Sequence, residues 1–196
     1  YKSMYLYLLY PTNELIKIYN QDQVEIRRLM DDQLNNMVKI LMKNKDYGQV
    51  AIKAEFEAEG TTSKELLRLK ELSRIVELPL VVKIGGCEAI RDLYECQDLG
   101  ISKVVAPMIE SQYAAFKYKT ALDRVYTNDQ NKPKSFINVE TKSGFQNIKE
   151  ICSEIFQNLN GIVLGRVDYV GSLGLSRDEI NSERVLNDSL ILSKEC

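Results

Sequence analysis

The sequence predicts an α/β fold of the TIM (β/α)8-barrel type, and three observations support it. Short apolar runs alternate five times with longer stretches that carry apolar residues at helical spacing. Runs such as "LVV", "VVA" and "IVL" are typical of parallel strands that are covered on both faces. Charged side chains follow these runs, at the end of the strands where barrel enzymes carry their chemistry.

The five predicted strands are apolar runs bounded by turn residues. They cover residues 49–57, 78–86, 102–110, 135–141 and 161–171. A doubly wound open sheet has the same alternation of strands and helices. However, no G-x-G-x-x-G or Walker loop follows any of these runs, which weakens that alternative. The barrel is therefore the preferred fold.

Helical periodicity fills the segments after each predicted strand. The predicted helices cover residues 60–77, 87–100, 111–126 and 145–159, and a last one lies within 176–196. Ser63 is predicted to cap the first of them. Because parallel strands need crossover connections, these helices are expected to join the strands.

A further amphipathic helix is predicted before the first strand, over residues 22–44. Its apolar stripe consists of Ile26, Met30, Leu34, Met37 and Leu41. We therefore expect a helical extension over residues 1–48 that packs on a barrel domain over residues 49–196.

Five such units do not close an eight-stranded barrel, even if the run "MYLYLLY" adds a sixth strand. The barrel is therefore expected to be truncated at its C-terminal end. An incomplete barrel leaves open sheet edges, so core-facing residues of the last strand, such as Val163, are expected to be exposed.

Composition excludes several classes of function. The 196 residues carry a net charge of −2 with no basic block, which argues against nucleic-acid binding, and no apolar run is long enough for a membrane span. The chain has no histidine, which excludes a Ser-His or Cys-His pair and the usual zinc sites. The four cysteines form no C-x-x-C motif, and reduced thiols in a cytoplasmic protein are expected.

Charged residues at the carboxyl ends of the predicted strands form the candidate site. Glu140 and Asp168 end neighbouring strands, and Lys83 ends another. Two carboxylates make a hard-oxygen site that suits Mg²⁺ or Mn²⁺, and a nearby cation adds charge stabilisation. Glu59 and Glu110 also follow strands, but for these two a solvated loop position is the better interpretation.

Four segments together resemble the HpcH/HpaI aldolase and citrate lyase β-subunit family, a group of TIM barrels. They are "VVKIGGCEA", "VVAPMIES", "FINVETKSGFQNI" and "GIVLGRVDYVGSLGLSRDEIN". The resemblance spans about residues 49 to 185. It implies a metal-dependent carbon–carbon lyase that acts on an oxo acid or a CoA thioester through a metal-stabilised enolate.

The resemblance also implies roles for individual residues. Glu140 and Asp168 match the family's metal ligands, and the metal is expected to be Mg²⁺ or Mn²⁺. Lys83 and Glu55 are the expected catalytic residues. The expected substrate-binding residues are Lys83, Asn138, Glu57, Gly165 and Arg166. Family members are commonly oligomeric, so a homo-oligomer is expected.

The chain departs from the family at two points. Aldolases of this family often use a histidine as the base, and lysine replaces the usual arginine at Lys83, which removes a bidentate contact. Two alternatives therefore stay open. One is a Schiff-base aldolase that uses Lys83 or Lys53. The other is a non-catalytic barrel that retains a metal or ligand pocket.

Overall fold

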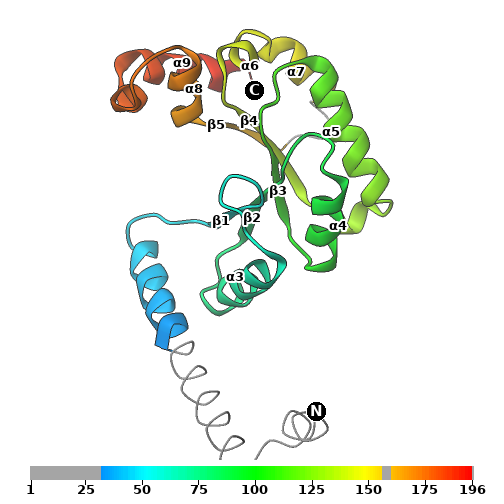
Figure 1. The fold of residues 1–196 in the computed structure, drawn as a ribbon, viewed down its shortest axis with the longest axis vertical. Coiled ribbons are helices and arrows are strands. Elements are labelled where there is room, and N and C mark those ends of the chain that lie inside the picture. The colour runs from blue at the N-terminus through cyan, green and yellow to red at the C-terminus, as the bar shows by residue number, and fades with distance from the viewer. Residues whose placement is uncertain (1–31, 156–159, 196) are drawn as a thin grey trace, which may run out of the picture. The chain divides into compact units, whose positions relative to one another are not determined.

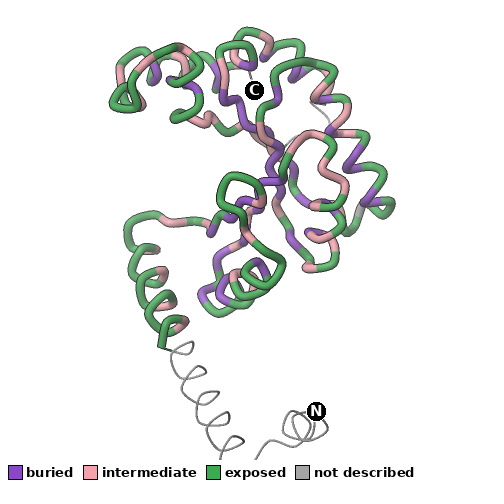
Figure 2. Tube along the Cα trace, in the orientation of Figure 1, coloured by how far each residue is buried: buried purple, intermediate pink, exposed green. Residues whose placement is uncertain are grey.

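The structure is a computed structural model that describes residues 32–155 and 160–195. The chain divides into two units at Gln49 and Val50. In the first unit, residues 32–45 form a helix whose side chains are exposed or half-buried (Figure 2). This helix agrees with the C-terminal part of the predicted helix.

Several predictions fall on residues outside the described ranges. They concern the N-terminal part of the predicted helix, with Ile26 and Met30, and the run "MYLYLLY". The packing of the extension on the barrel therefore stays a prediction.

The second unit contains one parallel five-stranded sheet with the strand order β1-β2-β3-β4-β5 (Figure 1). The strands are β1 (Ile52–Glu55), β2 (Leu80–Lys83), β3 (Lys103–Ala106), β4 (Lys134–Val139) and β5 (Gly161–Leu164). Each observed strand lies within a predicted strand, except that β4 begins one residue earlier than predicted. Most residues of β1 to β4 are buried, whereas β5 has no buried residue (Figure 2).

Helices connect the strands and pack on one another in sequence. The helices are α3 (Ser63–Ile75), α4 (Ile90–Asp98), α5 (Gln112–Val125), α6 (Lys142–Gln146), α7 (Ile148–Ile155), α8 (Arg166–Ser172) and α9 (Glu183–Glu195). Two 3-10 turns are η1 (Asp129–Asn131) and η2 (Arg177–Asn181). Helix α4 contacts α5, α5 contacts α7 and α7 contacts α9 (Figure 1).

The sequential strand order distinguishes between the two predicted architectures. A doubly wound sheet reverses its strand order at a switch point. Here the order never reverses, so right-handed crossovers place the helices on the same side of the sheet, as in a barrel. Strands β1 and β5 are the two edges, so the sheet is open within the described residues.

The two faces of the sheet differ in character because side chains alternate along a strand. One face carries Ala54, Val82 and Val104, which are paired in register and at most 1% exposed. The opposite face carries the polar residues Glu55 and Lys83 in register. This second face is the inner face of a barrel-like arrangement, and it positions the candidate site.

The prediction of a long fifth strand over residues 161–171 was wrong. Strand β5 ends at Leu164, and α8 begins at Arg166 after Gly165. The apolar residues that resembled a continued strand are helical, because Tyr169 and Val170 are buried against a local cluster that includes Phe145. Val163, as expected, is exposed, at 39%.

Two helix starts also differ from the predictions. The N-cap of α3 is Thr62 rather than Ser63, and Thr62 and Glu65 form a reciprocal capping box. The predicted helix over 145–159 begins earlier and is split, because Thr141 caps α6 and a separate helix α7 follows.

Candidate active site at the carboxyl ends of the strands

Glu55 and Lys83 form the first part of the site. Each is the last residue of its strand, and the two are in-register neighbours on β1 and β2. Because directly paired residues point to the same face, their side chains meet. The Lys83 Nζ atom lies 2.7 Å from Glu55 Oε1, and both residues are 8% exposed.

Glu140 joins this pair from β4. It directly follows that strand, and the two-residue period of a strand places it on the same face as Asn138. Lys83 Nζ donates to Glu140 Oε1 at 3.2 Å, and Asn138 Nδ2 donates to the same oxygen at 2.8 Å. Glu140 is 3% exposed. The ammonium of Lys83 therefore lies between two buried carboxylates.

These surroundings determine the charge of Lys83. Burial by itself lowers the pKa of the Lys83 ammonium, but the hydrogen bonds and negative charges of Glu55 and Glu140 outweigh it and raise the pKa above its ordinary value. Lys83 is therefore a cation at neutral pH. A cation suits charge stabilisation, whereas Schiff-base formation needs the neutral amine.

The remaining hydrogen bond to Glu140 comes from the loop after β3, within the "VVAPMIES" segment, where no site residue was predicted. The backbone N–H of Met108, just after β3, donates to Glu140 Oε2 at 3.1 Å. Nothing in the sequence marks this residue, because Met108 and Glu140 lie 32 positions apart. All the described protein donors to Glu140 thus come from Lys83, Asn138 and Met108.

Gly165 provides space for the Glu140 side chain. A Cβ atom on Gly165 would lie 2.4 Å from Glu140 Cγ and 2.8 Å from Glu140 Oε1, so only glycine fits there. Gly165 is also the N-cap of α8. Glu140 therefore lies against the start of the helix that carries Asp168 in its first turn.

The structure places the other predicted residues of this region at the surface. Asp168 is exposed, and the structure records no hydrogen bond or ion pair that holds its carboxylate within the described ranges. Arg166 is also exposed, and its guanidinium donates to Asn181 Oδ1 and to the carbonyl oxygen of Ile180. Arg166 thus reaches toward η2, while the Asp168 carboxylate has no hydrogen-bond or ion-pair partner among the described residues.

Glu57 lies in the loop after β1 and contacts the loop after β2. It is exposed, and a Cβ atom on Gly85 would lie 2.7 Å from Glu57 Cγ. The N–H of Gly85 donates to Asp92 Oδ2 at 2.7 Å. Glu57 therefore packs over the turn that follows Lys83, beside the buried cluster.

Glu110 makes hydrogen bonds that hold local structure, in line with its interpretation as a loop residue. Its carboxylate accepts a hydrogen bond from the hydroxyl of Thr141, which in turn caps α6. Its carbonyl oxygen accepts from Asn147 Nδ2 at 2.8 Å. Glu110 thus helps to anchor α6.

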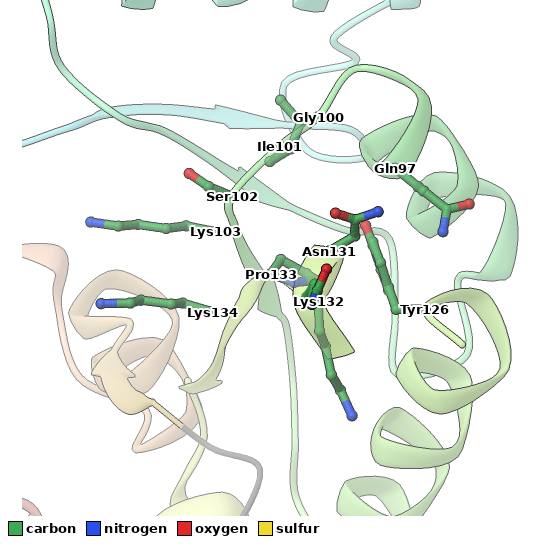
Figure 3. Close-up of a pocket in the computed structure, with 11 residues that line it drawn as sticks. Gln97, Gly100, Ile101, Ser102, Lys103, Tyr126, Asn131, Lys132, Pro133 and Lys134 are labelled. Atoms are coloured by element: carbon green, nitrogen blue, oxygen red, sulfur yellow. The ribbon is translucent and has the colours of Figure 1, made fainter. Parts of the chain in front are cut away.

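A cavity of about 580 Å³ lies away from this cluster, at the amino ends of β3 and β4 (Figure 3). Tyr126 and Gln97 border it, and both donate to backbone carbonyl oxygens. Lys103 and Lys134 extend side by side, away from Tyr126 and Gln97 (Figure 3). The cavity is therefore separate from the charged cluster at the opposite strand ends.

A divalent cation in this cluster would need oxygen ligands from several side chains. Within the described ranges, no group of three or more His, Cys, Asp and Glu side chains is arranged to hold a metal ion. The potential metal-ligating atoms of the cluster are nonetheless hard oxygens, namely those of the Glu55 and Glu140 carboxylates and Asn138 Oδ1, which is buried without a hydrogen-bond partner. Mg²⁺ commonly uses only one or two protein carboxylates, so a Glu140 and Asp168 pair is chemically compatible with it.

Comparison with known proteins assigns the chain to one protein family. The sequence model of the HpcH/HpaI aldolase/citrate lyase family matches residues 52–189. No curated protein matches the chain. Among residues 32–155 and 160–195, no helix is long and apolar enough to cross a membrane.

Solved structures share the fold at low sequence identity. A HpcH/HpaI aldolase/citrate lyase family protein from Burkholderia cenocepacia J2315 is 16% identical, with a TM-score of 0.62, over 81% of this chain and 71% of that one. Citrate synthase SbnG is 15% identical, with a TM-score of 0.63, over 81% of this chain and 68% of that one. RipC from Yersinia pestis is 18% identical, with a TM-score of 0.54, over 76% of this chain and 66% of that one.

Proposed function

Because the chain belongs to the HpcH/HpaI aldolase/citrate lyase family, we propose that it is a metal-dependent carbon–carbon lyase that acts on an oxo acid or an acyl-CoA. The observation that carries the proposal is the buried Glu140 carboxylate at the end of β4, with the Lys83 ammonium 3.2 Å away. Buried charges are costly, and clusters of them at barrel strand ends are typical of active sites.

Glu140 and Asp168 are the residues that would hold Mg²⁺ or Mn²⁺. When bound, the cation supplies Lewis-acid stabilisation of the negative charge that develops on an oxo-acid substrate. Asn138 orients Glu140 through its amide N–H, and its buried Oδ1 has no hydrogen-bond partner among the described residues. Gly165 leaves room for Glu140 beside the start of α8.

Lys83 supplies a fixed positive charge for the developing oxyanion. The two flanking carboxylates keep it protonated and hold it in place. Glu55, hydrogen-bonded to Lys83, is the carboxylate best placed to exchange a proton with the substrate in a chain without histidine. Glu57 and Arg166 are proposed to contact substrate from the rim.

Metal binding is the first test of this function. Calorimetric titration with Mn²⁺ should give saturable binding to the wild type, and Glu140→Ala should abolish it or weaken it at least about tenfold. Glu59→Ala, an exposed carboxylate in the loop after β1, is the matched control and should bind like the wild type. Equal binding by all three proteins would contradict the assignment of Glu140.

Activity assays separate the metal route from the Schiff-base route. With a panel of oxo acids and acyl-CoA substrates, EDTA should abolish cleavage and added Mn²⁺ should restore it. Borohydride with substrate should leave no covalent adduct, because Lys83 is held as an ammonium. An adduct on Lys83 or Lys53 would favour the Schiff-base aldolase. Binding of Mn²⁺ without any turnover would favour the non-catalytic alternative.

A further inference from the structure

Met108 has a backbone conformation that is unusual for its residue type. Its φ angle is +50°, and Glu77 is the only other non-glycine residue with a positive φ within the described ranges. A side chain beyond glycine makes this left-handed conformation costly. The Met108 side chain is 47% exposed, so burial of the side chain does not explain why the conformation is kept.

Hydrogen bonds to the candidate site hold this backbone. The N–H of Met108 donates to Glu140 Oε2 at 3.1 Å, and the N–H of Ile109 donates to the carbonyl oxygen of Asn138 at 3.4 Å. Ile109 is 1% exposed, which anchors the far side of the turn. Pro107 precedes Met108 and restricts the chain on its other side. Strained residues of this kind cluster at functional sites.

The contact acts on the oxygen of Glu140 that is otherwise without a protein donor. Oε1 accepts hydrogen bonds from both Lys83 and Asn138, whereas Oε2 accepts only from Met108 among the described residues. Without this third donor, the carboxylate is held through Oε1 alone, and the position of Oε2 is less restrained. A donor on each oxygen fixes the plane of the carboxylate, with two donors on Oε1 and one on Oε2.

We propose that Met108 is a positioning residue whose left-handed backbone aims its N–H at Glu140 Oε2 and so presents the carboxylate to a divalent cation. The hydrogen bond between Met108 and Glu140 does not depend on the proposed function. Its effect on metal binding does rest on the proposed function. Partners that orient a metal ligand typically affect metal affinity about 10- to 100-fold.

Two substitutions at Met108 test the role of its backbone. Met108→Gly keeps the N–H and adopts a positive φ without strain, so Mn²⁺ affinity should stay within about twofold of the wild type. Met108→Val strongly disfavours a positive φ, so the N–H should turn away and Mn²⁺ affinity should fall at least about tenfold. Because the side chain is half-exposed, both variants should remain folded, which circular dichroism checks. Equal Mn²⁺ affinity of the folded valine variant and the wild type would overturn the proposal.

A second measurement needs no metal. In ¹H–¹⁵N spectra, the amide proton of residue 108 should shift upfield in Glu140→Ala, because it loses a charge-assisted hydrogen bond. The amide of Gln112, beyond the turn, is the internal reference. If the wild type binds no Mn²⁺ but the residue 108 amide still shifts in Glu140→Ala, the proposed function is refuted and the hydrogen bond is supported. An unchanged amide shift at residue 108 would refute the positioning role.

Discussion

At the residue scale, the candidate site is a set of charges that compensate one another. Lys83 is flanked by Glu55 and Glu140, and all three are at most 8% exposed. Removing one partner from such a group leaves a buried charge without compensation, which is strongly destabilising. The stability of the fold and the proposed chemistry of the site therefore involve the same side chains.

The pKa of Lys83 predicts a pH dependence of stability. Because its folded-state pKa is raised above the ordinary value of 10.5, the charged lysine stabilises the fold below that pH. This contribution should be lost as the pH rises through the folded-state pKa. Urea unfolding should show Lys83→Met less stable than the wild type by about 3 kcal/mol at pH 8, with the difference shrinking above pH 10.5.

Lys64→Met is the control for this experiment. Lys64 is exposed on α3, so this variant should follow the wild-type stability curve at every pH. A difference between Lys83→Met and the wild type that stays constant up to pH 12 would contradict the stabilising role of the ammonium.

At the element scale, the start of α8 decides where Glu140 can lie. The helix follows β5 after one glycine, and that glycine contacts the Glu140 side chain. A second glycine of the same helix, Gly171, has nothing within 4 Å of its would-be Cβ atom. The two glycines therefore have different roles in one short helix.

Alanine substitutions at these two glycines should have opposite effects. Gly165→Ala places a Cβ atom 2.4 Å from Glu140 Cγ, so the buried carboxylate must move. We expect a loss of about 1–3 kcal/mol in unfolding free energy, together with weaker Mn²⁺ binding. Gly171→Ala should stabilise the helix by about 0.5–1 kcal/mol. Urea unfolding measures both, and equal effects would argue against the assigned role of Gly165.

At the scale of the whole molecule, the sheet has two open edges within the described residues. Strands β1 and β5 each have one strand neighbour. Apolar side chains of β5 and α9 are exposed, with Val163 at 39%, Leu186 at 57% and Leu190 at 59%. Open parallel edges and exposed apolar groups favour association with further polypeptide.

We therefore expect the 196-residue chain by itself to self-associate rather than form a stable monomer. Size-exclusion chromatography with light scattering should show a mass that rises with protein concentration. The double substitution Leu186→Glu and Leu190→Glu adds charge to the exposed side of α9 and should reduce the association. A monodisperse monomer with a cooperative thermal melt would contradict this prediction and would show that the chain closes its own core.

Local patterns in the sequence determined the five strand–helix units and most of the strand-end residues. Strand and helix periods are properties of neighbouring residues, so Glu55, Lys83 and Glu140 were identifiable as ends of apolar runs. The same patterns failed after Leu164. The apolar residues of α8 resemble a strand until their packing against Phe145 is known.

Only the tertiary structure decided which of these residues meet. The pairing of β1 with β2 brings Glu55 to Lys83, and the loop after β3 brings the Met108 N–H to Glu140 across 32 positions of sequence. Gly165 leaves no room for a side chain because Glu140, distant in sequence, occupies the space beside it. Periodicity specifies the face on which a residue lies, but strand order and register specify its neighbours, and these arise only when the elements pack together.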